Sequence, residues 1–157
     1  MQSNRALATY LKDHFAGSSA GVSLASRIAD GAGNEYERHE MEGIAADIEA
    51  DRRSLRSLME RLEVSPSRVK SAGAWLGQKV GAVKLNAIRA DNRVLQYESM
   101  IMGVTGKLEL WRSLEQNNFK GAAALNAGEV RKLRERAENQ RARLEKLHAD
   151  AASALRG

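Results

Sequence analysis

Residues 41–62, MEGIAADIEADRRSLRSLMERL, decide the fold class of this chain. Apolar side chains recur there every three or four positions, at Met41, Ile44, Ile48, Leu55, Leu58 and Leu62. This spacing places them on one face of an α-helix, whereas a β-strand would need them at every second position. Asp51 interrupts the same face. The stretch is therefore predicted to be an amphipathic helix with a carboxylate on its buried side.

Three further stretches carry the same helical periodicity. In residues 4–29 one face holds Leu7, Leu11, His14, Ser18, Val22, Ala25 and Ala29. In residues 92–116 the face is less regular and combines Val94, Ile101, Leu108 and Trp111 with Glu98 and Thr105. After a capping box at Asn126 and Glu129, the last face holds Val130, Leu133, Ala137, Gln140, Leu144, Leu147 and Ala151. Four long helices are expected.

The connections fix how these helices are joined. Glycines in residues 30–34, DGAGN, predict a tight turn, so the first two helices should form a hairpin. Residues 117–121 predict a second hairpin. Between the hairpins, Ser65 and Pro66 begin an amphipathic stretch, for which we expect a shorter helix within 65–90. The predicted fold is an all-α four-helix bundle of two hairpins joined by a long crossover, in a single domain covering 1–157.

The core of this bundle follows from the four apolar faces. We expect the leucine and isoleucine side chains nearest their centres to be almost inaccessible to solvent. These are Leu7, Leu11, Ile44, Ile48, Leu55, Leu58, Ile101, Leu108, Leu133, Leu144 and Leu147.

Composition narrows the classes of protein that this chain could be. It has 157 residues, no cysteine, one proline and 4% aromatic residues. Without cysteine, disulfides and thiolate metal sites are excluded. No run approaches the ~20 apolar residues of a membrane-spanning helix, and no secretory signal pattern opens the chain. We therefore expect a soluble cytoplasmic protein.

In its helix order the chain resembles the ferritin-like superfamily, whose bundles also join two hairpins by a long crossover. Metal-using members place a carboxylate on each of two helices and Glu-x-x-His on each of the other two. The match here is Glu145-Lys-Leu-His148, at the edge of the fourth apolar face. The resemblance therefore implies the architecture, and the di-metal motif is incomplete.

Polar residues on the apolar faces are the candidate site, because a buried polar group needs a partner. The predicted buried polar cluster contains His14, Asp51, Glu98, Thr105 and Gln140. His14 and Asp51 are equally far from the first turn, which predicts that they lie at the same height and form a charge-assisted hydrogen bond. Ser18 and Gly21, near His14, predict close helix packing, with a cavity as the alternative.

The alternative for this cluster is metal binding. His14, Asp51 and Glu98 together would suit one Fe, Mn or Zn ion, since one imidazole and two carboxylates are an adequate ligand set. The main hypothesis involves no cofactor. Nor does the sequence contain a credible catalytic triad or phosphate-binding loop.

The net charge of +5 raises the question of an anionic partner. Residues 65–93 hold six Lys or Arg against one Asp, and a basic amphipathic helix over 69–88 could contact an anionic membrane. Docking across the bundle is the other interpretation. Along the fourth helix, acidic residues interleave with basic ones, so specific nucleic-acid binding is not expected. We expect a non-enzymatic bundle that acts through association with itself or a protein partner. The alternative is a ferritin-like metal-binding redox or storage protein.

Overall fold

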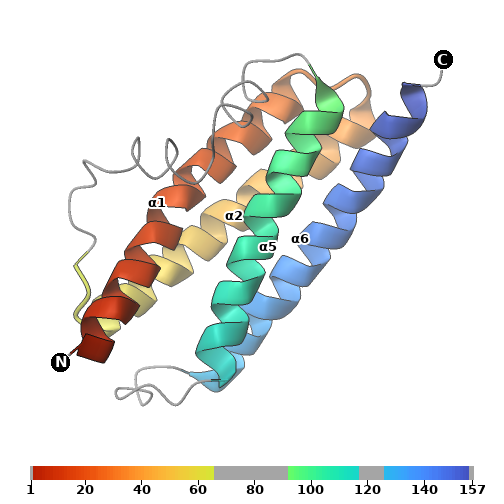
Figure 1. Ribbon diagram of the computed structural model, residues 1–157. Coiled ribbons are helices and arrows are strands. Elements are labelled where there is room, and N and C mark those ends of the chain that lie inside the picture. The colour runs from red at the N-terminus through yellow and green to blue at the C-terminus, as the bar shows by residue number, and fades with distance from the viewer. Residues whose placement is uncertain (1, 66–91, 117–125, 156–157) are drawn as a thin grey trace.

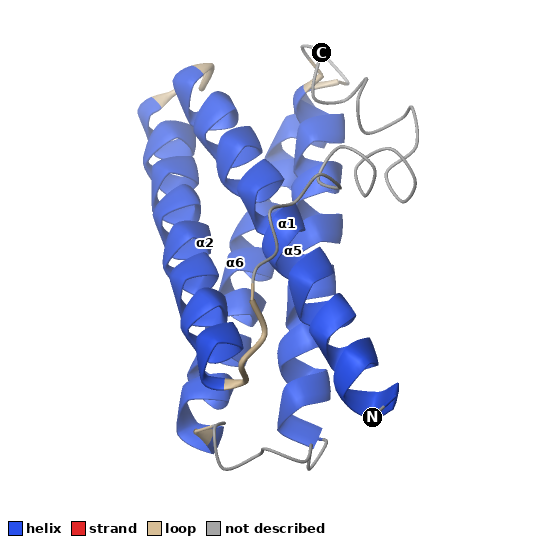
Figure 2. Ribbon diagram, turned by 90° about the vertical axis from the view of Figure 1, so that its left-hand side faces the viewer, coloured by secondary structure: helices blue, strands red, loops and turns tan. Residues whose placement is uncertain are grey.

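A computed structural model describes residues 2–65, 92–116 and 126–155 (Figure 1). It contains helices α1 (Gln2–Asp30), α2 (Glu35–Arg61), α5 (Arg93–Gln116) and α6 (Ala127–Ala154). Strands are absent from these three described ranges, and Figure 2 colours their residues as helix or as loop. The predicted all-α class and the four long helices are confirmed. The shorter helix expected within 65–90 lies outside the described residues.

The helices pack as two antiparallel hairpins. α1 packs along α2 and α5 along α6, with additional contacts between α1 and α5 and between α2 and α6. In Figure 1, α2 ends at the opposite end of the bundle from the start of α5. The two hairpins are therefore arranged as a long crossover requires.

Hydrogen bonds and an ion pair of Glu37 connect the first turn to α5. Asn34 Oδ1 accepts a hydrogen bond from Glu37 N at 2.8 Å, and Glu37 Oε2 accepts one from Gly33 N at 2.7 Å. From α5, Tyr97 donates its hydroxyl to Glu37 Oε1 at 2.5 Å, and Arg93 Nε lies 3.0 Å from the same oxygen. The cap of α2 thus also contacts the second hairpin.

The end of α2 uses a left-handed residue. Val64 N donates to Met59 O at 2.8 Å, and this bond wraps the last turn around Glu63, which has φ 56°. Glycine favours this conformation, because a Cβ atom there approaches the carbonyl oxygen. Val64 packs against the core and holds the turn closed.

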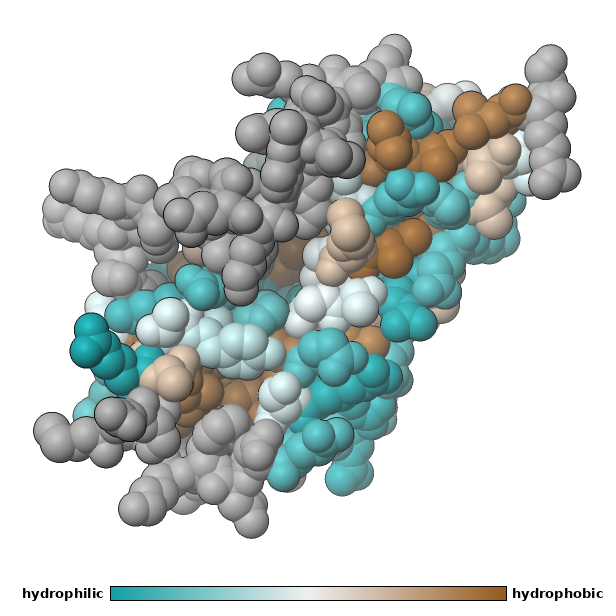
Figure 3. All heavy atoms as spheres, in the orientation of Figure 1, coloured by the Kyte–Doolittle hydropathy of each residue, from teal (hydrophilic) through white to brown (hydrophobic). Residues whose placement is uncertain are grey.

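The core extends along the bundle as two apolar clusters of buried residues. Nine of the eleven predicted core residues are buried, and the other two, Leu7 and Ile101, are half-buried. Leu7 lies near the free end of α1. On α5 the buried face runs through Tyr97, Met100 and Val104, one position away from Ile101. Hydrophilic residues gather on the outer side of α6 (Figure 3).

Candidate functional site

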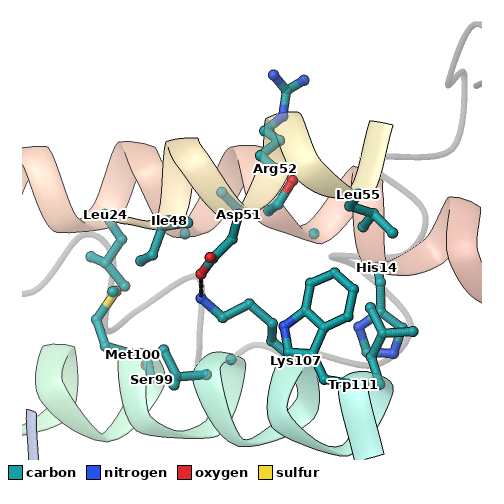
Figure 4. Close-up of a pocket in the computed structure, with 17 residues that line it drawn as sticks. His14, Leu24, Ile48, Asp51, Arg52, Leu55, Ser99, Met100, Lys107 and Trp111 are labelled. Carbon is teal, nitrogen blue, oxygen red and sulfur yellow. Dashed lines mark hydrogen bonds and ion pairs between the residues drawn. The ribbon is translucent and has the colours of Figure 1, made fainter. Parts of the chain in front are cut away.

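Asp51 is the centre of a buried polar cluster that joins the two hairpins. Its side chain, on α2, is only 2% exposed. Lys107 Nζ on α5 lies 2.6 Å from Oδ2, and a dashed line marks this ion pair in Figure 4. Gln140 Nε2 on α6 donates to the same oxygen at 2.9 Å. Arg136, one turn before Gln140, forms an ion pair with Oδ1. Both carboxylate oxygens are therefore engaged.

Lys107 contacts two other members of the cluster. It donates a second hydrogen bond to Gln140 Oε1, so the Gln140 amide donates to the carboxylate and accepts from the ammonium. Burial lowers the pKa of Lys107, while the nearby Asp51 carboxylate acts in the opposite direction. The ion pair thus offsets part of the cost of placing an ammonium in the interior, and burial remains the larger effect.

A cavity of about 110 Å³ lies beside this cluster, between α1, α2 and α5. Its wall is largely apolar and includes Leu24, Ile48, Leu55, Met100, Val104, Leu110 and Trp111. Space remains partly because Gly17, Gly21 and Gly103 contribute no side chains. A Cβ atom at Gly103 would meet no atom within 4 Å, whereas one at Gly21 would lie 3.7 Å from Ile48. The face around Ser18 and Gly21 therefore borders a cavity, although close packing was expected there.

Two buried donors at the cavity have no hydrogen-bond partner among the described residues. They are Trp111 Nε1 and Arg52 Nε. The Arg52 guanidinium is otherwise engaged, since it stacks 4.6 Å from the centroid of the Phe15 ring. The Trp111 side chain is fully buried, and Figure 4 shows it extending from α5 beside Lys107 and His14. The indole N–H is thus a buried donor to which neither solvent nor the cavity has access.

The structure brings only part of the sequence-predicted cluster together. Asp51 and Gln140 are buried and hydrogen bonded to each other. His14 lines the same cavity. Its ring lies edge-on to the Tyr10 ring, with 4.7 Å between the two ring centroids. The cations facing Asp51 are nevertheless Lys107 and Arg136, not His14. The expected direct pairing of His14 with Asp51 is replaced by ion pairs to the second hairpin.

Glu98 and Thr105 lie elsewhere. The Glu98 side chain is 50% exposed and its Oε1 is 3.3 Å from His148 Nε2, so its predicted inward orientation is wrong. Thr105 is half-buried on α5. The structure thus does not assemble His14, Asp51 and Glu98 as ligands of one ion. Across residues 2–65, 92–116 and 126–155, no three His, Cys, Asp or Glu side chains are grouped as a metal site would need.

One long stretch of α1 lacks charged residues. Residues 14–26 of α1 contain no Asp, Glu, Lys or Arg, and Ser19, Ser23 and Ser26 are exposed there. The α2–α6 side instead carries ion pairs between helices, such as Arg143 with Glu40 at 2.7 Å and Arg61 with Glu129 at 2.8 Å. α1 therefore offers an uncharged surface on a highly charged protein.

The fold and site define this chain as an all-α four-helix bundle with a charged cluster inside it. Comparison with protein families, curated proteins and solved structures found no match. None of the helices in the described part of the chain is long and apolar enough to cross a membrane.

Proposed function

We propose that this protein is a non-enzymatic ferritin-like bundle that acts by associating with a second copy of itself. The observation that carries the proposal is the uncharged surface of α1, residues 14–26. Charged residues are depleted at the centres of protein interfaces, because their desolvation is costly.

The net charge supports self-association through this surface in particular. Two copies that each carry a net charge of +5 repel one another overall. In a twofold interface the same patch meets itself, so any charge at its centre faces a like charge. The face of α1 avoids this repulsion, and its serines allow two helices to approach closely.

The buried cluster supports a structural rather than a catalytic role. Asp51, Lys107 and Gln140 satisfy one another, and Arg136 neutralises the second carboxylate oxygen. A general base or a nucleophile needs a group that can reach its substrate. Here the ionised groups instead hold α2 against α5 and α6.

The test compares two exposed serines in similar helical settings. Ser23→Glu places a charge on the uncharged surface of α1, and Ser57→Glu places the same charge on α2. Each new glutamate has an arginine four residues later, Arg27 or Arg61, so either can form an i,i+4 ion pair within its helix.

Mass would be measured by light scattering after gel filtration and by sedimentation equilibrium up to submillimolar concentration. We expect the wild type and Ser57→Glu to dimerise equally, and Ser23→Glu to dimerise at least tenfold more weakly. A monomeric wild type over the whole range would contradict the proposal, as would equal weakening by both substitutions.

A further inference from the structure

The cavity between α1, α2 and α5 opens to solvent beside Gly103 of α5, which is exposed. From α1 the same cavity is lined by small residues, including Gly17 and Ala20. We infer that this opening is a docking groove for the crossover of the same chain, and that residues 69–88 pack there as an amphipathic helix. The crossover itself, residues 66–91, lies outside the described part of the chain.

The two ends of the crossover require it to run along the bundle. α2 ends at Arg61 and α5 begins at Arg93, and these points lie at opposite ends of the bundle in Figure 1. As a helix rising about 1.5 Å per residue, residues 66–91 would span about 39 Å, close to the roughly 40 Å of α2. A helical crossover therefore reaches α5 only if it lies alongside the other helices.

Charge selects the side on which it lies. Both α2 and α5 pack against α1 and against α6, so the crossover can pass over either of these two helices. α6 has seven Lys or Arg against five Asp or Glu, and residues 65–93 hold six against one, so the route over α6 brings like charges together. Residues 14–26 of α1 and 99–106 of α5 contain no charged residue. The route over the α1–α5 groove avoids the repulsion.

The apolar surfaces of crossover and groove match. At 3.6 residues per turn, the apolar residues of the crossover fall within about 80° of the helix circumference. They are Val69, Ala72, Leu76, Val80, Val83 and Ala87. The groove offers Leu24, Ile48 and Met100 in its wall. An apolar face that would otherwise contact water is thus buried against an apolar wall, which is favourable.

α5 has room for a further neighbour at this height. Apolar residues extend around most of this helix, and a helix of that kind is normally buried on all sides, yet Gly103 and Met102 are exposed. Val80 and Gly103 lie about thirteen and ten residues from Arg93 in opposite directions, so they should be nearly level in antiparallel helices. A Cβ atom added at Gly103 would meet no atom within 4 Å, which leaves space for a side chain of the crossover.

The groove and the proposed dimer interface occupy different faces of α1. Ser19, Ser23 and Ser26 are exposed, whereas Gly17 and Leu24 line the groove. The helical repeat places these two sets roughly 140° apart around the helix. Docking of the crossover therefore leaves the serine face free, and the inference is independent of the proposed self-association.

The absence of cysteine from the chain makes introduced thiols specific probes. Val80→Cys places a thiol on the apolar face of the crossover, and Gln78→Cys places one roughly 160° away on the same predicted helix. We expect the native full-length Val80→Cys protein to react with a water-soluble disulfide reagent about tenfold more slowly than Gln78→Cys, because a docked thiol reacts only after local opening. Both should react equally fast in urea. Equal rates in the native proteins would overturn the inference.

A nitroxide attached to Gln78→Cys then locates the crossover on the bundle. In the full-length ¹⁵N-labelled protein, the label should broaden the backbone amide resonances of residues 14–24 and 99–106 more than those of residues 138–146 on α6. Stronger broadening on α6, or no broadening on either side, would overturn the inference. Because Gln78 is a polar residue away from the apolar face, this measurement also decides the question if Val80→Cys fails to fold.

The same measurement in the Ser23→Glu background separates this inference from the proposed function. The pattern of broadening should be unchanged there, since the serine face points away from the groove. In a mixture of ¹⁵N-labelled protein without nitroxide and nitroxide-labelled protein without ¹⁵N, both carrying Ser23→Glu, the groove resonances should stay sharp. Broadening in that mixture would show that the groove holds the crossover of a second copy, which would overturn docking within one chain.

Discussion

Replacing Asp51 by alanine should destabilise the fold more than any other loss of a single carboxylate among the described helices. The substitution removes the partner of Lys107, whose side chain is only 14% exposed, and also the acceptor of the Gln140 amide. Removing one member of a buried ion pair typically costs about 3–5 kcal/mol. For a chain of this size that corresponds to a fall in melting temperature of roughly 6–20 °C.

The loss should depend on pH in a defined direction. Burial already lowers the pKa of Lys107, and without Asp51 the contribution that opposes this lowering is gone. The unfolded chain, in which lysine titrates near 10.5, then binds more protons than the folded one. Stability of Asp51→Ala should therefore rise as the pH increases from the lowered pKa of Lys107 toward 10.5.

Two comparisons make the measurement specific. Asp47→Ala removes another carboxylate of α2. The Asp47 side chain is 35% exposed and pairs with Arg143, so its loss should lower the free energy of unfolding by at most about 1 kcal/mol. The triple variant Asp51→Leu, Lys107→Met, Gln140→Met replaces the three most buried members of the cluster by apolar side chains, leaves the partly exposed Arg136 in place, and should cost less than Asp51→Ala alone. Urea unfolding followed by circular dichroism gives all three values. An Asp51→Ala loss no larger than that of Asp47→Ala would refute the reasoning, as would a triple variant less stable than the single one.

Three further predictions concern other parts of the bundle. Burial and the hydrogen bond to Glu37 raise the pKa of Tyr97, so its contribution to stability should be lost as the pH rises above 10.0. Tyr97→Phe should cost about 1.5–3 kcal/mol in urea unfolding, and the wild type and this variant should show the same absorbance change at 295 nm up to about pH 11. Leu144→Ala should cost about 2–5 kcal/mol, because that side chain is fully buried, and the half-buried Leu7→Ala clearly less; equal losses would contradict the assigned faces. Glu63→Gly should raise stability by about 1 kcal/mol in thermal unfolding, since φ at this position is 56°, and a decrease would show that the glutamate side chain matters more than the backbone.

The helices and their pairing could be predicted from two features. Apolar residues recur every three or four positions along the long helices, and residues 30–34 and 117–121 have the composition of turns. The glycines of residues 30–34 marked the turn before α2, and in the structure Asn34 caps that helix by accepting a hydrogen bond from Glu37 N. The rotation of α5 was harder to predict, because this helix has apolar residues around most of its circumference. That ambiguity placed Ile101 and Glu98 inward, while Tyr97 and Met100 occupy the buried face.

Only part of the candidate site could be predicted from the sequence, for a related reason. Asp51 and Gln140 stood out because short polar side chains interrupted regular apolar faces. Lys107 and Arg136 did not, since long basic side chains beside such faces are typical of the solvent side, where the charged end reaches water. In Lys107 the end turns inward, as the proximity of Asp51 on another helix requires. The spacing of apolar residues along one helix does not show which residues of another helix lie beside it.

The cluster around Asp51 also determines how the two hairpins are aligned along the length of the bundle. Apolar faces repeat with every turn, so they would tolerate a slide of one hairpin along the other by one helical turn, about 5.4 Å. Such a slide would move Lys107 and Gln140 away from Asp51 and leave a carboxylate against leucine and valine side chains. The charges therefore exclude shifted alignments that the hydrophobic residues alone would allow. In the triple variant this exclusion is absent, so its hairpins should be less uniquely aligned than those of the wild type.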